Sequence, residues 1–352
     1  MISYGQLPIL PELGLRPNML KWVPARPALA YDNPTGDIQI FKAWRTKARR
    51  QMNLCLGDEI PQVDPRPKVL ERVQLDGYSR TTFTLATAPG MRALCWLLLP
   101  DGAGVGAKLP AMIATPGHGI GAKDLIGLDE KGNPREEGKG YQKDYGLAAV
   151  RHGIATLVIE PLGFGERRDY EMAFPEYLES GCHAASSIAT MLGTTLARIR
   201  LHDIQRGIDY LQNHPAIDSS RIGLMGISGG GQMTLWTMAM EPRLKLAIVS
   251  GYFNTFKDSV MGMHHCICNF VPGMAKYFDM VDLAMMAYPR PLLIQSGTQD
   301  HIFPLKAAKK AIRELTSRYA KLGEKKRIEV DIFEGPHMWS PAKVNTFLDR
   351  WL

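Results

Sequence analysis

The chain has 352 residues, of which 45% are hydrophobic, and its formal net charge is +7. This length and apolar content allow a large core, and they favour one α/β domain with insertions over two domains of equal size. This net positive charge is consistent with weak electrostatic attraction to acidic substrates, including sugars that carry uronic acids. Basic clusters such as residues 325–327 lack interleaved aromatic residues, so we expect no nucleic-acid partner.

Cysteine usage and the absence of targeting segments indicate where the protein works. The five cysteines are an odd number without dense spacing, which is typical of a reducing compartment and not of a disulfide framework. The sequence has no run that is long and apolar enough to cross a membrane, and its start lacks the pattern of a signal peptide. We therefore expect a cytoplasmic protein with no membrane partner.

The first 66 residues differ in composition from the rest of the chain. Residues 4–34 are rich in proline and have little periodicity, so we expect an irregular segment that wraps the protein. Ile38–Leu56 has the pattern of an amphipathic helix. Its basic residues Lys47, Arg49 and Arg50 fit a solvated face, or a contact in a homo-oligomer, better than an anionic partner. We predict an N-terminal arm over residues 1–66.

From about residue 70, strand patterns alternate with helix patterns. This alternation predicts an α/β fold over residues 67–352, with a mostly parallel sheet and helices on both faces. Leu109–Thr115 predicts a buried strand, and the glycine-rich sequence PGHGIG at 116–121 predicts a loop that a ligand can approach closely. After the next strand, we expect Glu160 to bond the turn at 163–165 and to have no catalytic role. The pattern from Leu192 to Leu211 predicts a helix that ends before Pro215.

Residues 221–242 (RIGLMGISGGGQMTLWTMAMEP) place a serine between glycines where an apolar strand gives way to an apolar helix. In a strand-to-helix elbow of the form G-x-S-x-G, side chains at the flanking positions would collide, and Gly226 and Gly230 avoid that collision. The alternative is a helix N-cap serine after a glycine turn. The strand before the motif and the helix after it favour Ser228 as a nucleophile.

A serine nucleophile needs a base, and the base needs a group that orients it. Residues 291–297 predict a buried strand, and Asp300 lies in the loop at its end. Residues 327–333 predict the next strand, which is followed by His337. The order Ser228, Asp300, His337 is that of an α/β-hydrolase and differs from the chymotrypsin and subtilisin orders.

Other carboxylates and histidines compete for these roles. The strand at residues 244–250 is followed by no carboxylate until Asp258, and Asp282 has an alternative role as a helix N-cap. His301 is adjacent to Asp300, and neighbouring side chains in an extended loop point away from each other. We therefore prefer Asp300 and His337 as the acid and base.

Backbone N–H groups must stabilise the oxyanion that forms when the serine attacks a carbonyl. We expect one donor from Gly229, because unpaired N–H groups and the helix dipole point outward at a helix start. We expect the second donor from Gly119 or Ile120 in the loop at 116–121. His118, in the same loop, either contacts substrate or braces the loop.

Two cysteines at 266 and 268 raise the question of a metal. Cys266 and Cys268, with His264 and His265 beside them, lack the separated ligand pairs of a zinc site. Serine chemistry needs no metal. The sequence therefore predicts neither a metal nor a cofactor.

Six motifs are spread along residues 70–352: PGHG at 116–119, EPLGFGER at 160–167, GISGGG at 226–231, HHCICNFVPGM at 264–274, PRPLLIQSGTQDHIFP at 289–304 and EGPH at 334–337. On these motifs the chain resembles α/β-hydrolases of the bacterial branch that includes acetyl xylan esterase-like and dienelactone hydrolase-like proteins. The resemblance implies a serine esterase without cofactor that acts on acetylated sugars or other small acyl esters. The tyrosine-bearing oxyanion loop of acetyl xylan esterases proper is missing, because Ile120 follows Gly119, and this weakens acetyl xylan as the substrate.

The resemblance also implies a lid or pocket insertion at about residues 252–285. In that setting His265 and Cys266 are expected to line or support the acyl pocket. Together with His118 and Trp339, they are the predicted substrate-binding residues.

We therefore predict a serine carboxylic-ester hydrolase that acts through an acyl-enzyme on small acyl esters, with acetylated carbohydrates as one class. A serine peptidase, a thioesterase or a lactone hydrolase of the same fold is the alternative. A peptidase of the prolyl-oligopeptidase type normally carries a large N-terminal propeller, for which this arm is too short. A non-catalytic binding module is less consistent with the sequence, because Ser228, Asp300 and His337 are all present.

Overall fold

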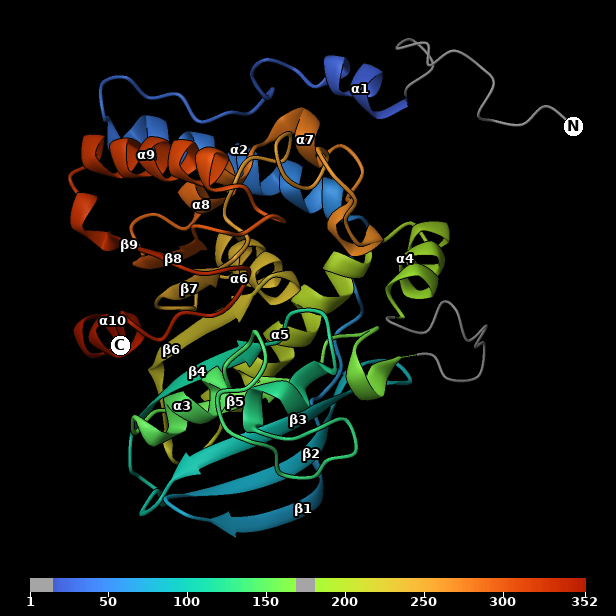
Figure 1. Cartoon of the computed structure of the whole chain (residues 1–352), viewed down its shortest axis with the longest axis vertical. Coiled ribbons are helices and arrows are strands. Elements are labelled where there is room, and N and C mark those ends of the chain that lie inside the picture. Colours follow the sequence, from blue (N-terminus) through green and yellow to red (C-terminus); the bar gives the residue numbers. More distant parts are fainter. Residues whose placement is uncertain (1–14, 169–180) are drawn as a thin grey trace, which may run out of the picture.

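The computed structural model describes residues 15–168 and 181–352 (Figure 1). Residues 1–14 of the predicted arm lie outside that part of the chain. The described residues form a nine-stranded sheet in the order β1-β2-β3-β5-β4-β6-β7-β8-β9. The pairs from β1 to β5 are antiparallel, and those from β5 to β9 are parallel. The strands are β1 (Lys68–Leu75), β2 (Tyr78–Ala88), β3 (Met91–Pro100), β4 (Leu109–Thr115), β5 (Ala155–Ile159), β6 (Ile217–Ile227), β7 (Ala247–Ser250), β8 (Leu292–Gly297) and β9 (Ile328–Phe333).

Helices cover both faces of this sheet (Figure 1). Successive side chains of a strand point to opposite faces. In β4, accordingly, Ala111 and Ile113 belong to one core cluster, and Met112 and Ala114 belong to another. The first cluster includes residues of α2 (Ile38–Leu56), α5 (Leu196–Gln212), α6 (Gly229–Met240), α8 (Met280–Met286) and α9 (Leu305–Lys321), and the second includes residues of α3 (Tyr145–Arg151) and α10 (Val344–Trp351).

Other helices of the described residues lie in the connections. They are α1 (Leu15–Met19), α4 (Cys182–Met191) and α7 (Met274–Tyr277), together with 3-10 turns such as η7 (Ile267–Asn269). Among the described residues, none of the helices has both the length and the apolar character that a membrane crossing requires.

The amphipathic helix predicted at Ile38–Leu56 is confirmed as α2. Asp37 caps its start by accepting a hydrogen bond from the Gln39 amide at 2.7 Å. Lys47 and Arg50 are exposed, as expected. Arg49 is not on a solvated face, because its guanidinium donates to the carbonyls of Ala239 and Met286. This part of the arm therefore packs into the first core cluster.

The predicted strands around the site are confirmed in position. Leu109–Thr115 is β4, and the strands expected at 291–297 and 327–333 are β8 and β9, each one residue shorter at its start. The helix expected from Leu192 begins later, at Leu196, because the Thr195 side chain caps it by accepting from the Arg198 amide at 3.1 Å. The carboxyl ends of parallel strands meet at one edge, so the loops after β4, β6, β8 and β9 lie close together.

Candidate active site

Ser228 occupies the sharp turn between β6 and α6. Its backbone has φ 57° and ψ −118°, a conformation that a residue with a side chain rarely adopts. A Cβ on Gly226 would lie 2.5 Å from the carbonyl carbon of Gly230, and a Cβ on Gly230 would collide with the Thr115 carbonyl. Only glycine fits at these two positions, as the sequence predicts. Ser228 is partly exposed, although the residues on either side of it are buried.

The start of α6 presents backbone donors beside Ser228. The amide of Ser228 donates to the Ser250 carbonyl at 3.0 Å, and the Gln232 amide donates to the Ser228 carbonyl at 2.9 Å. Gln232 makes the first bond of the helix, so the amides before it, including that of Gly229, have no acceptor within the helix. This is the position from which we expected an oxyanion donor.

Asp300 and His337 form a buried, hydrogen-bonded pair. The Asp300 Oδ2 lies 2.7 Å from the His337 Nδ1, and the two side chains are 1% and 9% exposed. The other carboxylate oxygen, Oδ1, accepts from the amides of Ile302 and Phe303 at 2.8 and 2.9 Å. The Asp300 side chain is thereby fixed, and it in turn orients the imidazole.

The second nitrogen of His337, Nε2, is buried and has no hydrogen-bond partner among the described residues. A Cβ built on Gly251 would lie 2.8 Å from the His337 ring, and the neighbouring Ser250 carbonyl holds the Ser228 amide. The Phe303 ring packs on the imidazole with its centroid 5.8 Å away and an angle of 23° between the ring planes. The imidazole is thus seated next to the serine elbow with one nitrogen available.

The competing residues have other partners or positions. Asp282 belongs to a capping box with Asp279 at the start of α8, and it also accepts from Arg318 at 2.7 Å. Asp258 accepts from the Thr255 hydroxyl at 2.7 Å. His301 is exposed. None of these contacts joins a competing residue to Ser228.

The loop at 116–121 approaches Ser228 closely. A Cβ on Gly117 would lie 3.1 Å from the Cβ of Ser228, and the Gly117 amide donates to Gln142 Oε1 at 2.8 Å. Gly119 has φ 141° and is exposed, with open space where a side chain would be. The predicted donors Gly119 and Ile120 therefore follow closely after Gly117, whose backbone lies next to Ser228.

Tyr141 is a site residue that the sequence did not indicate. Its hydroxyl donates to the His118 carbonyl at 2.5 Å, and its ring packs on His337 with centroids 5.8 Å apart. Burial raises the pKa of the Tyr141 phenol, so the hydroxyl remains a donor at neutral pH. Tyr141 connects the loop at 116–121 to the imidazole. It precedes α3 in an irregular segment, where no sequence pattern marks it.

Glu160, at the end of β5, supports the same loop. Its carboxylate accepts from the Ala122 amide at 3.0 and 3.2 Å, and the Glu166 amide also donates to it. Burial raises the pKa of Glu160 to about 7, although these amides oppose the shift. Glu160 thus connects the loop after β4 to the turn at 163–165. This supports the structural role that we expected for it.

Three of the four predicted substrate-binding residues lie around the elbow. A Cβ on Gly229 would lie 3.1 Å from the His118 ring, and the His265 ring packs on Phe303 with centroids 5.2 Å apart. His265 and Cys266 also line a pocket of about 360 Å³, whose other lining residues are His183, His264, Ile267 and Phe270.

Trp339 requires a correction. Its side chain is in the core, 2% exposed, and its indole stacks on Tyr145 with ring centroids 4.1 Å apart. A ring buried in this way has no face for a substrate, so the prediction that Trp339 binds substrate is wrong.

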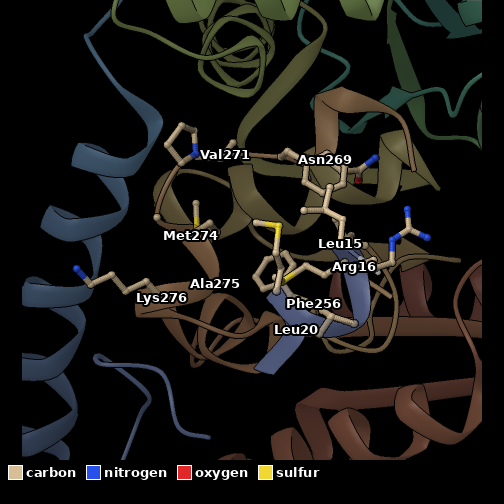
Figure 2. Close-up of a pocket in the computed structure, with 15 residues that line it drawn as sticks. Leu15, Arg16, Leu20, Phe256, Asn269, Val271, Met274, Ala275 and Lys276 are labelled. Atoms are coloured by element: carbon tan, nitrogen blue, oxygen red, sulfur yellow. The ribbon is translucent and has the colours of Figure 1, made fainter. Parts of the chain in front are cut away.

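A different pocket, of about 530 Å³, lies between α1 and residues 256–276 (Figure 2). Its labelled lining residues include Leu15, Phe256, Val271 and Met274, which are apolar. The residues that line it do not include Ser228, Asp300 or His337. We therefore assign no reaction to this pocket.

His118 also belongs to a compact group with three cysteines. Its ring nitrogen and the sulfurs of Cys182, Cys266 and Cys268 all lie within 4.8 Å of one another. The Cys268 and Cys182 sulfurs lie 3.4 and 3.7 Å from His118 Nε2. The sequence did not indicate this group, because its members come from three segments that are far apart in the chain.

Comparisons with known proteins agree with this architecture. The model of the Abhydrolase family matches residues 9–321, which include Ser228 and Asp300. A Bacillus subtilis (strain 168) protein with the name "Putative hydrolase YtaP" is 25% identical over 326 residues, which cover 88% of this chain and 100% of that protein.

Solved structures with 15 to 16% identity share the fold. A "putative acetyl xylan esterase" from Bacteroides fragilis NCTC 9343 matches with a TM-score of 0.75 at 16% identity, over 95% of this chain and 84% of that chain. A glucuronoyl esterase from Solibacter usitatus matches with a TM-score of 0.63 at 15% identity, over 93% of this chain and 98% of that chain. The predicted α/β-hydrolase fold is confirmed.

Proposed function

The chain belongs to the Abhydrolase family, and from that premise we propose that it is a serine carboxylic-ester hydrolase that acts on small acyl esters. The observation that carries this proposal is the buried Asp300–His337 pair, whose imidazole packs against Gly251 and keeps Nε2 free. The residue before Gly251, Ser250, holds the amide of the strained Ser228. A strained nucleophile position and an oriented base with one available nitrogen are what acyl transfer requires.

The reaction proceeds in two halves. His337 Nε2 takes the proton of the Ser228 hydroxyl as its oxygen attacks the ester carbonyl, and a tetrahedral oxyanion forms. The amide of Gly229 and an amide of Gly119 or Ile120 donate to that oxyanion. The C–O bond to the alcohol then breaks, and His337 gives its proton to the leaving alcohol. An acyl-enzyme on Ser228 remains.

Water completes the cycle by the same steps. His337 removes a proton from the water, the resulting hydroxide attacks the acyl carbonyl, and Ser228 leaves with the proton that His337 returns. Asp300 accepts the hydrogen bond of Nδ1–H throughout, and it stabilises the imidazolium that forms in each half.

Carbohydrate esters are the substrate class that we propose. Structures with this fold include proteins described as a "putative acetyl xylan esterase" and a glucuronoyl esterase. The His265 ring packs on Phe303, which in turn packs on His337, so the pocket of about 360 Å³ that His265 and Cys266 line lies beside the proposed base. Its lining residues do not include Ser228, and we propose that it holds the part of a small ester that lies away from the reacting carbonyl. We assign residues 252–285 to the wall of that pocket, and the net charge of +7 favours acidic sugars. The five free cysteines suit a reducing compartment, so we place this activity in the cytoplasm.

The test is hydrolysis of 4-nitrophenyl acetate, followed by a panel of acetylated sugars, uronic-acid methyl esters, thioesters and lactones. Ser228→Ala should lower kcat/KM by about 10⁴-fold or more. The matched control is Ser219→Ala, because Ser219 is exposed near the opposite end of β6 and should leave the rate unchanged. Equal activity in wild type and Ser228→Ala would refute the proposed nucleophile, and the panel identifies the ester class.

A further inference from the structure

The group formed by His118, Cys182, Cys266 and Cys268 goes beyond the ester-hydrolysis machinery. We propose that these four residues bind a zinc ion in a tetrahedral site with three thiolates and one imidazole. The sequence predicts no metal, because the ligands do not form paired motifs. The fold brings them together from the loop after β4, the first residue of α4 and the segment at η7.

The distances from His118 to two of the cysteines already fit a zinc site. A tetrahedral ion with Zn–S bonds of about 2.3 Å and a Zn–N bond of about 2.0 Å holds sulfur and nitrogen about 3.5 Å apart, and two sulfurs about 3.8 Å apart. His118 Nε2 lies 3.4 Å from the Cys268 sulfur and 3.7 Å from the Cys182 sulfur. All four ligand atoms lie within 4.8 Å of one another, which is close to the spacing that one ion requires.

The surroundings also suit the charge of such a site. A zinc ion with three thiolates has about one net negative charge, which is costly to bury without a cation. The buried guanidinium of Arg200 lies against the group, with its Nη2 3.1 Å from the Cys182 sulfur. Arg200 is itself held by the Leu162 carbonyl at 2.6 and 2.9 Å. A fixed positive charge thus faces the sulfurs.

A zinc ion here would act on the loop that carries the proposed oxyanion donors. Four protein ligands leave no open position for water or substrate, so the site is structural and not catalytic. The ion would hold His118, and the His118 ring lies beside Gly229 at the start of α6. In the chain, His118 directly precedes Gly119. It would thereby fasten α4 and the segment at η7 to the elbow.

The test is the zinc content of the untagged full-length protein, measured by mass spectrometry of the metal after gel filtration in reducing buffer. We expect about one zinc ion per chain, and at least about a tenfold loss in Cys266→Ser and Cys268→Ser. Cys55→Ser is the matched control, because it removes a buried thiol outside the group and should retain the zinc. Zinc retained equally in all variants would mean adventitious binding and would overturn the proposal.

A second measurement on the wild type decides the matter if the variants fail to fold. Metal-free protein titrated with Co²⁺ should develop thiolate-to-cobalt charge-transfer absorption and the visible bands of a tetrahedral ion. A protein that contains no zinc and gives no such bands would refute the site. An unreduced mass about 2 Da below that of the reduced chain would indicate a disulfide, which would also refute it. These readouts are independent of ester hydrolysis, so they do not depend on the proposed function.

Discussion

Asp300 and His337 are 37 residues apart in the chain and are joined by a hydrogen bond of 2.7 Å between Oδ2 and Nδ1. Asp300 follows β8 and His337 follows the adjacent parallel strand β9, so the sheet itself sets their separation. The pairing leaves Nε2 of His337 without a hydrogen-bond partner among the described residues.

Asp300→Asn should lower kcat by about 10⁴-fold with little change in the fold. The amide can present an N–H to Nδ1, which favours the wrong imidazole tautomer and removes the charge that stabilises the imidazolium. Steady-state kinetics with 4-nitrophenyl acetate measure the effect. Asp258→Asn is the control, because Asp258 has its own partner in Thr255. Loss of activity in Asp258→Asn but not in Asp300→Asn would mean that Asp300 is not the carboxylate that orients His337.

Tyr141→Phe should lower kcat about tenfold and leave KM nearly unchanged. The substitution keeps the ring on His337 but removes the donor to the His118 carbonyl, so the loop at 116–121 loses a hydrogen bond worth about 1 kcal/mol. Tyr288→Phe removes a similar bond to the Leu322 carbonyl elsewhere. It should cost stability without affecting kcat. An equal loss of kcat in both variants would mean that Tyr141 acts only on stability and not by positioning the loop.

Gly230→Ala should destabilise the protein by about 3 kcal/mol or more, because its Cβ would collide with the backbone of Thr115. Denaturant unfolding measures this change. Gly104→Ala is the control, since a Cβ there meets nothing within 4 Å. A Gly230→Ala protein as stable as the control would contradict the proposed tight packing between the elbow and β4.

The pH dependence of the free energy of unfolding should reveal the raised pKa of Glu160. Burial favours its protonated form in the folded state and raises its pKa from 4.5 to about 7. The folded state therefore binds more protons than the unfolded state between these values, and stability decreases as pH rises from about 4.5 to 7. Glu160→Gln should remove that contribution, whereas Glu136→Gln, at an exposed position, should retain the wild-type slope. Identical slopes in wild type and Glu160→Gln would refute the shifted pKa.

Local sequence patterns were enough to predict most of the elements around the site. The strand, glycine turn and apolar helix at Ser228 lie within one short segment, and the strands before Asp300 and His337 are apolar runs with polar loops after them. Elements of this kind depend on residues that are neighbours in the chain, so their positions could be predicted.

Features that depend on contacts between distant segments could not be predicted in this way. Tyr141 and the partners of Cys182 come from separate parts of the chain, and no spacing marks them. Trp339 and Arg49 were misplaced for the same reason, because their surroundings are set by Tyr145 and by the carbonyls at the end of α6 and α8. The antiparallel order of β1 to β3 also depends on pairing that no single strand pattern shows.

Ser228 is tested most directly as the nucleophile by trapping it with a fluorophosphonate and locating the adduct by peptide mass spectrometry. We expect one adduct per chain, on Ser228, with parallel loss of esterase activity, and no adduct in Ser228→Ala. His337→Ala should react far more slowly, because the base that activates the hydroxyl is gone. An adduct on a different residue, or an enzyme that hydrolyses esters but never labels at Ser228, would contradict the proposed serine mechanism.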